Sequence, residues 1–326
     1  MADVTSVQVT APSRLHFGLS SFGHAAVPQY GGVGLMLQEP QVRLRITESS
    51  GSEWEFYGPG AARAELFAKR WVVSSGNVVR RGCRIVVQQL PPPHAGLGSG
   101  TQLALSVAAG LNHFFCYEQP SPCDLARSVG RADRSTVGTF GFVHGGLIWE
   151  TGKNESHEDA RLNGRWSLLE DWRVVLIRAV HRPGISGDAE RQAFRQLPPV
   201  PPEVTRALLS EVSTRMVPAV EVGDFDKFSE SVYAYGKQAG ECFATIQGGP
   251  YAGENLACVI ETLRDWGIRG VGQSSWGPTV FALVPNSQSV GTLMKRVRTD
   301  LDDCVEEVMV SQVNNVGASV DVECLT

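Results

Sequence analysis

Hydrophobic and polar residues alternate along several short segments, whereas apolar residues recur every three to four positions along longer ones. Alternation predicts β-strands, and the longer period predicts amphipathic helices. Strands are predicted at residues 4–10, 42–47, 84–88, 173–177, 269–273, 279–284 and 306–313. Helices are predicted at residues 61–74, 103–114, 203–217, 225–247, 253–266 and 289–301. Interspersed strands and helices of this kind indicate an α+β protein.

The 326 residues are enough for two domains. The segment from Lys153 to Arg165 is polar and is predicted to be a surface loop, after which a strand pattern restarts at Arg173. We therefore expect an N-terminal domain at residues 1–165, with a Gly-rich phosphate loop, and a C-terminal α+β domain at residues 166–326.

Composition excludes several classes of protein. Apolar residues make up 42% and charged residues 19% of the chain, as in ordinary folded proteins. The net charge of -5, without a long basic run, argues against nucleic-acid binding. We find neither an apolar run of the ~18 residues that a membrane span needs nor a secretion signal. The seven cysteines are scattered without a CxxC pair, so we expect reduced thiols in the cytoplasm rather than disulfides or a zinc site.

A Gly-rich segment joins the strand at 84–88 to the helix at 103–114. It contains Gly96, Leu97, Gly98, Ser99, Gly100, Thr101 and Gln102. Glycines allow a ligand to approach the backbone, and a helix start offers unpaired N–H groups and the positive end of a dipole. The segment is therefore a candidate phosphate or pyrophosphate cradle, although a tight turn capped by Ser99 explains the same residues. It has neither the Walker GK[ST] nor a Rossmann acidic residue.

A second Gly-rich segment carries Arg131, Asp133 and Arg134. Guanidinium groups suit phosphate and carboxylate, and Asp133 could hold a magnesium ion or orient an arginine. The alternative is a solvated network of surface charges. His144 follows on the same segment, where a histidine more often has a structural role.

Two further segments carry candidate residues. Arg14 and His16 lie two residues apart on a predicted strand and so face one side, where buried basic groups need a protein carboxylate or an anionic ligand. Ser274, Ser275 and Trp276 lie in a polar Gly loop between two predicted strands. Trp276 could stack on an aromatic ligand or fill the core beneath a hairpin.

Together these segments resemble the GHMP kinase superfamily, whose hallmark is Pro-x3-Gly-Leu-Gly-Ser-Ser between a strand and a helix. Within it, the chain resembles the family of β-ribofuranosylaminobenzene 5′-phosphate synthases. The resemblance rests on four ordered motifs at Ser13–Leu19, Gly31–Gly34, Gly96–Gln102 and Gly272–Thr279. Where the kinases have the second serine of the hallmark loop, this chain has Gly100. The segment that corresponds to the third Gly-rich loop of the kinases contains Trp276 and Pro278 in this chain. These departures favour the synthase family, and the resemblance implies the two-lobe GHMP-kinase-like fold.

The resemblance implies a pentosyltransferase that joins phosphoribosyl pyrophosphate to 4-aminobenzoate or 4-hydroxybenzoate. The reaction forms a C–C glycosidic bond, releases carbon dioxide and pyrophosphate, and belongs to tetrahydromethanopterin biosynthesis. Since no proton leaves the ring, a strong general base is not obligatory. The backbone amides of Gly96–Thr101, Ser99 and a magnesium ion suit the leaving pyrophosphate.

The resemblance and the residue types together assign provisional roles. Arg14, Arg134 and His16 are the expected catalytic residues, and either arginine could hold the benzoate carboxylate or the 5′-phosphate. The expected substrate-binding residues are Arg131, His144, Ser274, Ser275 and Trp276. Asp133 is the candidate magnesium ligand, and His16, His94 and His144 could each hydrogen-bond a phosphate.

Two other functions stay open. A GHMP-type kinase would consume MgATP, with Asp133 or another acid as its base. A non-catalytic protein would bind a phosphate ligand without turning it over. A homodimer is expected for a cytosolic enzyme of this size. The sequence decides neither the amino or hydroxyl group of the acceptor nor the magnesium ligands.

Overall fold

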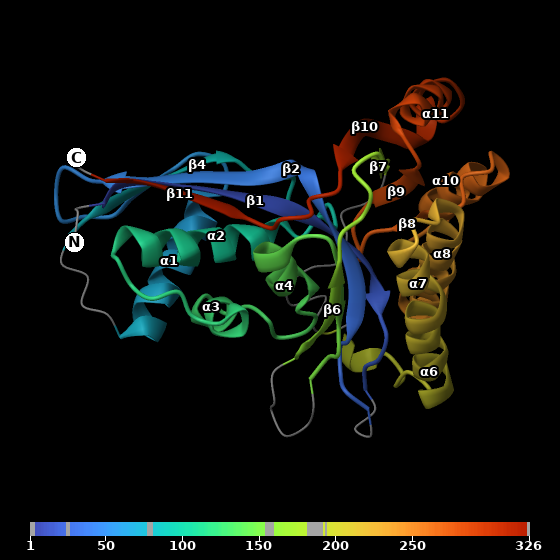
Figure 1. Ribbon diagram of the computed structural model, residues 1–326, viewed down its shortest axis with the longest axis horizontal. Coiled ribbons are helices and arrows are strands. Elements are labelled where there is room, and N and C mark those ends of the chain that lie inside the picture. Colours follow the sequence, from blue (N-terminus) through green and yellow to red (C-terminus); the bar gives the residue numbers. More distant parts are fainter. Residues whose placement is uncertain are drawn as a thin grey trace.

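A computed structural model describes residues 4–23, 27–76, 81–153, 160–180, 192 and 194–324 (Figure 1). Its first elements are β1 Val4–Leu19, β2 Gly32–Glu48, β3 Glu55–Tyr57, α1 Ala61–Ser75, β4 Cys83–Gln89, α2 Ser99–Phe114, α3 Pro122–Ser128, α4 Val137–His144, β5 Leu147–Glu150 and β6 Leu162–Trp166. Next come β7 Arg173–Ala179, α6 Pro202–Glu211, a π-helix Val212–Met216, α7 Val217–Glu221, α8 Phe225–Glu241, α9 Ala244–Gln247 and α10 Glu254–Asp265. The last are β8 Val271–Gln273, β9 Thr279–Val284, α11 Ser287–Asp300, a 3₁₀ turn Asp302–Cys304, β10 Val305–Gln312 and β11 Ser319–Cys324.

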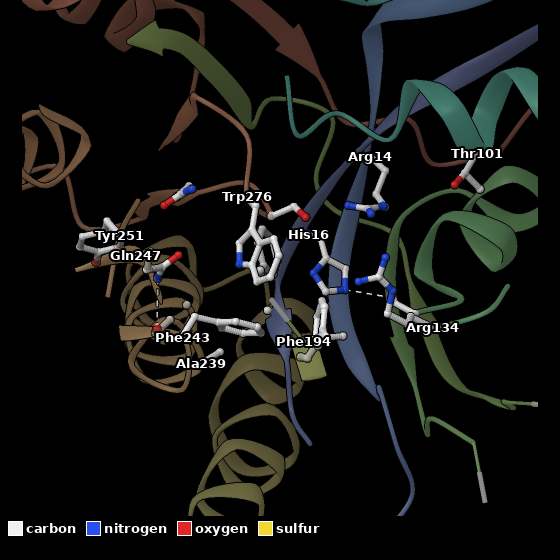
Figure 2. A pocket seen from close by; sticks show the side chains of 18 of the residues that line it. Arg14, His16, Thr101, Arg134, Phe194, Ala239, Phe243, Gln247, Tyr251 and Trp276 are labelled. Atoms are coloured by element: carbon white, nitrogen blue, oxygen red, sulfur yellow. Dashed lines mark hydrogen bonds between the residues drawn. The ribbon is translucent and has the colours of Figure 1, made fainter. Parts of the chain in front are cut away.

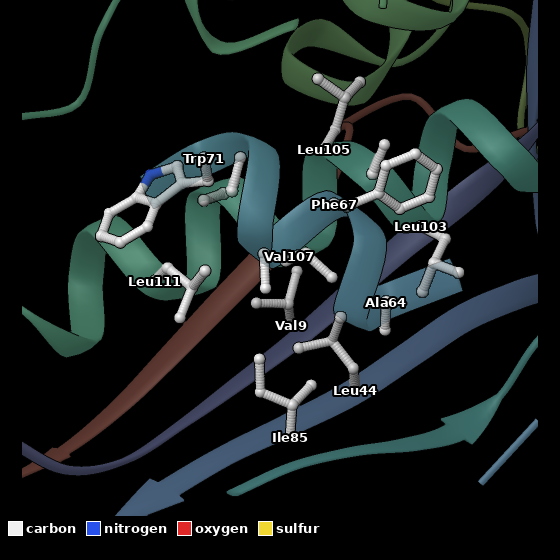
Figure 3. Close-up of a cluster of buried hydrophobic side chains, with 14 of the residues drawn as sticks. Val9, Leu44, Ala64, Phe67, Trp71, Ile85, Leu103, Leu105, Val107 and Leu111 are labelled. Atoms are coloured by element: carbon white, nitrogen blue, oxygen red, sulfur yellow. The ribbon is translucent and has the colours of Figure 1, made fainter. Parts of the chain in front are cut away.

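The first sheet has the strand order β11-β1-β2-β4-β3, with β5 added to β2 and β6 to β5. Helices α1 and α2 cover one of its faces (Figures 1 and 3). The core between them includes Val9, Leu44, Trp71 and Leu103, which are at most 1% exposed. The indole N–H of Trp71 donates to Oδ1 of Asn112 at 2.9 Å, so this large side chain is buried without an unpaired polar group.

The second sheet has the antiparallel order β10-β7-β9-β8. One face packs against α6, α7 and α8 through a core that includes Trp172 and Phe228. The other face packs against α10 and α11 through residues such as Ile177 and Ile260. Because both faces are covered, β7 and β9 read as continuous apolar runs in the sequence.

Strands β1 and β2 connect the two halves of the molecule (Figure 1). They pair from Ser6 opposite Thr47 to Leu19 opposite Gly32. The register shifts between Ala11 and Ser13 and again between His16 and Gly18. Such irregularities redirect side chains, and here they flank the segment that carries Arg14 and His16.

The α+β fold class predicted from the sequence is confirmed, and the predicted helices and strands match observed elements apart from their ends. The helix predicted at 203–217 contains the π-helix, and the one predicted at 225–247 ends at Glu241 before α9 begins. Ser121 caps the start of α3, since its side chain accepts from the amide of Asp124. No helix among the described residues is long and apolar enough to cross a bilayer.

The polar segment from Lys153 to Arg165 is not entirely a loop. Residues 154–159 lie outside the described residues, but Leu162–Trp166 form β6, which pairs with β5. This prediction was wrong because a polar edge strand is stabilised by backbone pairing and needs no apolar alternation. The division at residue 165 stays a prediction. Sheet membership does change between Trp166 and Arg173, while β11 returns to pair with β1 in the first sheet.

Candidate active site

One pocket, of about 280 Å³, lies where the two halves of the molecule meet (Figure 2). Its wall comes from β1, the start of α2, residues 131–135, α8, the segment around α9 and the loop between β8 and β9. Eight of the residues singled out from the sequence line it, namely Arg14, His16, Thr101, Arg131, Asp133, Arg134, Ser275 and Trp276. The fold thus brings together residues from three of the four motifs, and the motif at Gly31–Gly34 lies outside the lining.

The start of α2 forms a cationic end of the pocket. The amide of Arg14 donates to the carbonyl of Leu97 at 3.0 Å, which fixes the Gly-rich loop against β1. A Cβ at Gly98 would lie 3.3 Å from that of Arg14. A Cβ at Gly100 would overlap Nη2 of Arg63 and lie 3.3 Å from Nη2 of Arg131. Guanidinium groups therefore gather at a helix N-terminus, an arrangement that favours a bound anion.

Arg63 was not predicted from the sequence. It lies on α1, more than thirty residues before the Gly-rich loop, and nothing in its neighbourhood distinguishes it from a surface residue of an amphipathic helix. Partial burial lowers the pKa of Arg63 from its ordinary value. The guanidinium remains charged at neutral pH because arginine titrates far above that range.

Most of the predicted phosphate loop lies behind the pocket wall. Gly96, Leu97, Gly98, Ser99, Gly100 and Gln102 are outside the lining, whereas Thr101 is part of it. Gln102 is fully buried, and its Nε2 donates to the carbonyl of Gly138 at 2.9 Å. Ser274 is also fully buried. Its hydroxyl donates to the carbonyl of Gly96 at 2.8 Å and accepts from the amide of His16 at 3.1 Å, so it joins the loop to β1.

His16 is hydrogen-bonded to a buried carboxylate through a serine. Its Nε2 lies 3.0 Å from Oγ of Ser135, and Ser135 donates to Oε1 of Glu150 at 2.7 Å. Burial raises the pKa of Glu150, against the opposing effect of hydrogen bonds from Thr136 and Ser135. Burial, reinforced by the charge of Arg14, holds the pKa of His16 well below its usual value of 6.5. The imidazole is therefore neutral at pH 7.

Aromatic side chains form the opposite end of the pocket (Figure 2). The rings of Phe194 and Trp276 are stacked with centroids 5.0 Å apart, and Phe243 meets Trp276 edge-on at 5.2 Å. The guanidinium of Arg134 lies over Phe194, 4.5 Å from the ring centroid. The cationic and aromatic ends thus meet at this pair. The sequence indicated Trp276 but carried no local signal for Phe194 or Phe243.

The pocket lining contains one carboxylate, the exposed Asp133. No group of three or more His, Cys, Asp or Glu side chains within the described residues is arranged to hold a metal. Magnesium sites in phosphoryl chemistry often use one or two carboxylates together with substrate phosphates, and this donor set fits that kind of site. His144, at the end of α4, and His94 lie outside the lining. The carbonyl of His144 accepts from Nε of Arg165 at 3.1 Å.

Comparison with known proteins agrees with this description. The family described as GHMP kinases N terminal domain matches residues 61–146, from α1 to the end of α4. Solved structures with the same fold include homoserine kinase from Cytophaga hutchinsonii, with a TM-score of 0.69 and 16% identity over 98% of both chains. Galactokinase from Lactococcus lactis has a TM-score of 0.70 and 13% identity, over 96% of this chain and 95% of that one.

Curated relatives extend the match along the chain. A β-ribofuranosylphenol 5′-phosphate synthase from Methanothermobacter thermautotrophicus is 27% identical over 86% of this chain and 89% of its own. The protein of that name from Archaeoglobus fulgidus is 27% identical over 97% of this chain and 100% of its own. The resemblance predicted from the four motifs is thereby confirmed. The chain has the GHMP kinase fold and is similar along nearly its whole length to β-ribofuranosylphenol 5′-phosphate synthases.

Proposed function

We propose that this chain is a pentosyltransferase that joins phosphoribosyl pyrophosphate to a para-substituted benzoate, with loss of carbon dioxide and pyrophosphate, in tetrahydromethanopterin biosynthesis. The observation that carries the proposal is that a cationic end and an aromatic end of the same pocket meet at Arg134 and Phe194. One substrate carries several phosphate charges and the other is an aromatic acid. The names of the relatives specify a phenol product, which favours 4-hydroxybenzoate over 4-aminobenzoate as the acceptor.

The cationic end suits the pyrophosphate substrate. Arg14 and Arg131 line the pocket beside the start of α2, and Arg63 lies behind Gly100. Charge-assisted hydrogen bonds and the helix N-terminus stabilise negative charge that develops as pyrophosphate departs. Magnesium bound to these phosphates would neutralise further charge, with Asp133 as its protein ligand.

The aromatic end suits the benzoate. Its ring can pack against Trp276 and Phe194, which leaves the carboxylate toward Arg134. The bond from ribosyl C1′ to the pyrophosphate oxygen breaks, and the ring carbon that bears the carboxylate forms a bond to C1′. The bond to the carboxylate then breaks, and its electron pair restores the aromatic ring. No proton leaves a ring carbon, so the reaction needs no strong base, and burial, which lowers the pKa of His16, makes this histidine a weak one.

The ribosyl centre develops positive charge when pyrophosphate departs, as in glycoside hydrolysis. A protonated histidine beside it would repel that charge. The depressed pKa of His16 keeps the ring neutral, so burial of this residue is consistent with a cationic transition state.

The test is a release assay on the purified chain. It receives phosphoribosyl pyrophosphate, magnesium and either 4-hydroxybenzoate or 4-aminobenzoate, with ¹⁴C in the carboxyl group. We expect equal amounts of pyrophosphate and labelled carbon dioxide, and faster turnover with the hydroxylated acceptor. The Arg14→Ala variant, assayed in parallel, should lose most of this activity, which would show that the release depends on the pocket.

Two outcomes would reject the proposal. Release with neither acceptor, together with ATP consumption in a screen of small-molecule alcohols, would identify a kinase. Silence in both assays, with thermal stabilisation by pyrophosphate, would identify a binding protein.

A further inference from the structure

We propose that Ser135 and Glu150 are positioning residues that hold His16 as the Nε2–H tautomer, so that its Nδ1 lone pair accepts a hydrogen bond from a hydroxyl of the ribosyl substrate. This inference rests on the proposed function for the identity of the substrate. The tautomer itself follows from the protein alone.

The hydrogen bonds around Ser135 determine which atom carries the proton. Ser135 has one hydroxyl proton, which it donates to Oε1 of Glu150 at 2.7 Å. Its oxygen accepts from the amide of Val137 at 3.3 Å. The remaining contact, with Nε2 of His16 at 3.0 Å, is therefore one in which the serine oxygen accepts and the histidine donates.

Glu150 is surrounded by donors. It is fully buried, and Oε1 also accepts from the amide of Thr136 at 2.7 Å. The hydroxyl of Thr136 donates to Oε2. Oε1 faces the fixed N–H donor of Thr136 and is therefore an acceptor in either charge state of the carboxyl group, which leaves Ser135 to donate toward Glu150 rather than toward His16. A neutral imidazole with its proton on Nε2 has its lone pair on Nδ1.

His16 occupies the middle of the pocket. Figure 2 shows its ring between Trp276 on one side and Arg14 and Arg134 on the other. A ternary complex with phosphates at the cationic end and the benzoate at the aromatic end places the ribose between them. The groups that a ribose offers to a lone pair are its hydroxyls.

A neutral acceptor at this place assists the reaction. As positive charge develops at C1′, the neighbouring hydroxyl becomes a stronger donor, and hydrogen bonds to it strengthen in the transition state. The other tautomer would present an N–H and lose this contact. The effect of Ser135 and Glu150 is therefore expected in kcat more than in KM for the benzoate.

The first measurement needs no substrate. The ¹⁵N spectrum of protein labelled in its histidines, assigned with a His16→Gln variant, should show a protonated Nε2 and an unprotonated Nδ1 for His16. Ser135→Ala should lose this preference, whereas Ser135→Thr keeps a hydroxyl and should retain it. Ser128→Ala is the matched control, because the Ser128 hydroxyl donates to Leu125 on α3, outside the pocket lining.

The second measurement is turnover of phosphoribosyl pyrophosphate. Ser135→Ala should lower kcat about 2- to 12-fold, the range of one hydrogen bond between neutral groups, while Ser135→Thr restores much of it. Substrate analogues that lack either the 2- or the 3-hydroxyl of the ribose should each lower kcat. For the hydroxyl that contacts His16, the loss in kcat should not be additive with the loss caused by His16→Gln.

The outcomes separate this inference from the proposed function. Nδ1–H in the wild-type spectrum, or an unchanged kcat in folded Ser135→Ala, would overturn the inference even in an active enzyme. Additive losses for both deoxy analogues would overturn the ribosyl contact. If Ser135→Ala does not fold, the wild-type spectrum still decides the tautomer. An inactive wild-type chain with protonated Nε2 would instead reject the proposed function.

Discussion

Replacement of Gly100 by alanine should separate stability from ligand binding. Gly100 is in the first turn of α2, and an added Cβ there would overlap Nη2 of Arg63 and lie 3.3 Å from Nη2 of Arg131. The atoms in the way are the far ends of long side chains, so the guanidinium groups can move while the backbone stays in place. The variant should fold and yet lose the arrangement of charges at the helix start.

The two effects have opposite signs. Alanine is favoured over glycine in a helix by about 0.5–1 kcal/mol, which would raise Tm by about 1 °C in a chain of this size. Displacement of one guanidinium from a bound anion costs about 1.5–3 kcal/mol, equivalent to a roughly 10- to 100-fold higher Kd. We therefore expect a protein that is as stable as the wild type or more stable, with much weaker binding of pyrophosphate.

Titration calorimetry with inorganic pyrophosphate and differential scanning calorimetry measure the two quantities. Gly291→Ala is the matched control, because Gly291 is in α11 and an added Cβ there meets no atom within 4 Å. It should gain similar stability with unchanged binding. Unchanged pyrophosphate affinity in Gly100→Ala would refute the assignment of this helix start as the anion site. A large loss of stability would refute the expected movement of the arginines.

Three further predictions concern the pocket. Trp276→Ala removes the stacking on Phe194 and should raise KM for the benzoate about 2- to 12-fold, with a smaller change in KM for phosphoribosyl pyrophosphate. Steady-state kinetics with each substrate varied in turn measure the two constants, and an equal rise in both would contradict a contact between Trp276 and the benzoate. Asp133→Asn should raise the magnesium concentration needed for half-maximal turnover, and an unchanged magnesium titration would remove Asp133 as a ligand. Burial lowers the pKa of His16 in the folded state, so the unfolded chain binds its proton first as the pH falls below about 6.5. The free energy of unfolding should fall between pH 7.5 and pH 5 more steeply in the wild type than in His16→Gln, and equal slopes in urea unfolding would contradict this.

Local sequence patterns determined most of the elements and the order of the motifs. The helix at Ala61–Ser75 and the strand at Cys83–Gln89 follow from periodicity, and the Gly-rich loop follows from residue types alone. Periodicity was less informative for β1. The alternation at residues 4–10 is interrupted around Pro12 and resumes at Arg14, so the pattern did not show that one strand runs from Val4 to Leu19.

The tertiary structure decided how the site is assembled. Arg63 comes from α1, Glu150 from β5, and Phe194 and Phe243 from segments without an aromatic motif, yet all four lie in or against the pocket wall. His16 and Ser135 are 119 positions apart in the chain. Local patterns report which face of an element is buried, but they carry no information about which distant element covers it. The partners of a residue, and with them its charge state, are determined only when the two sheets and their helices pack together.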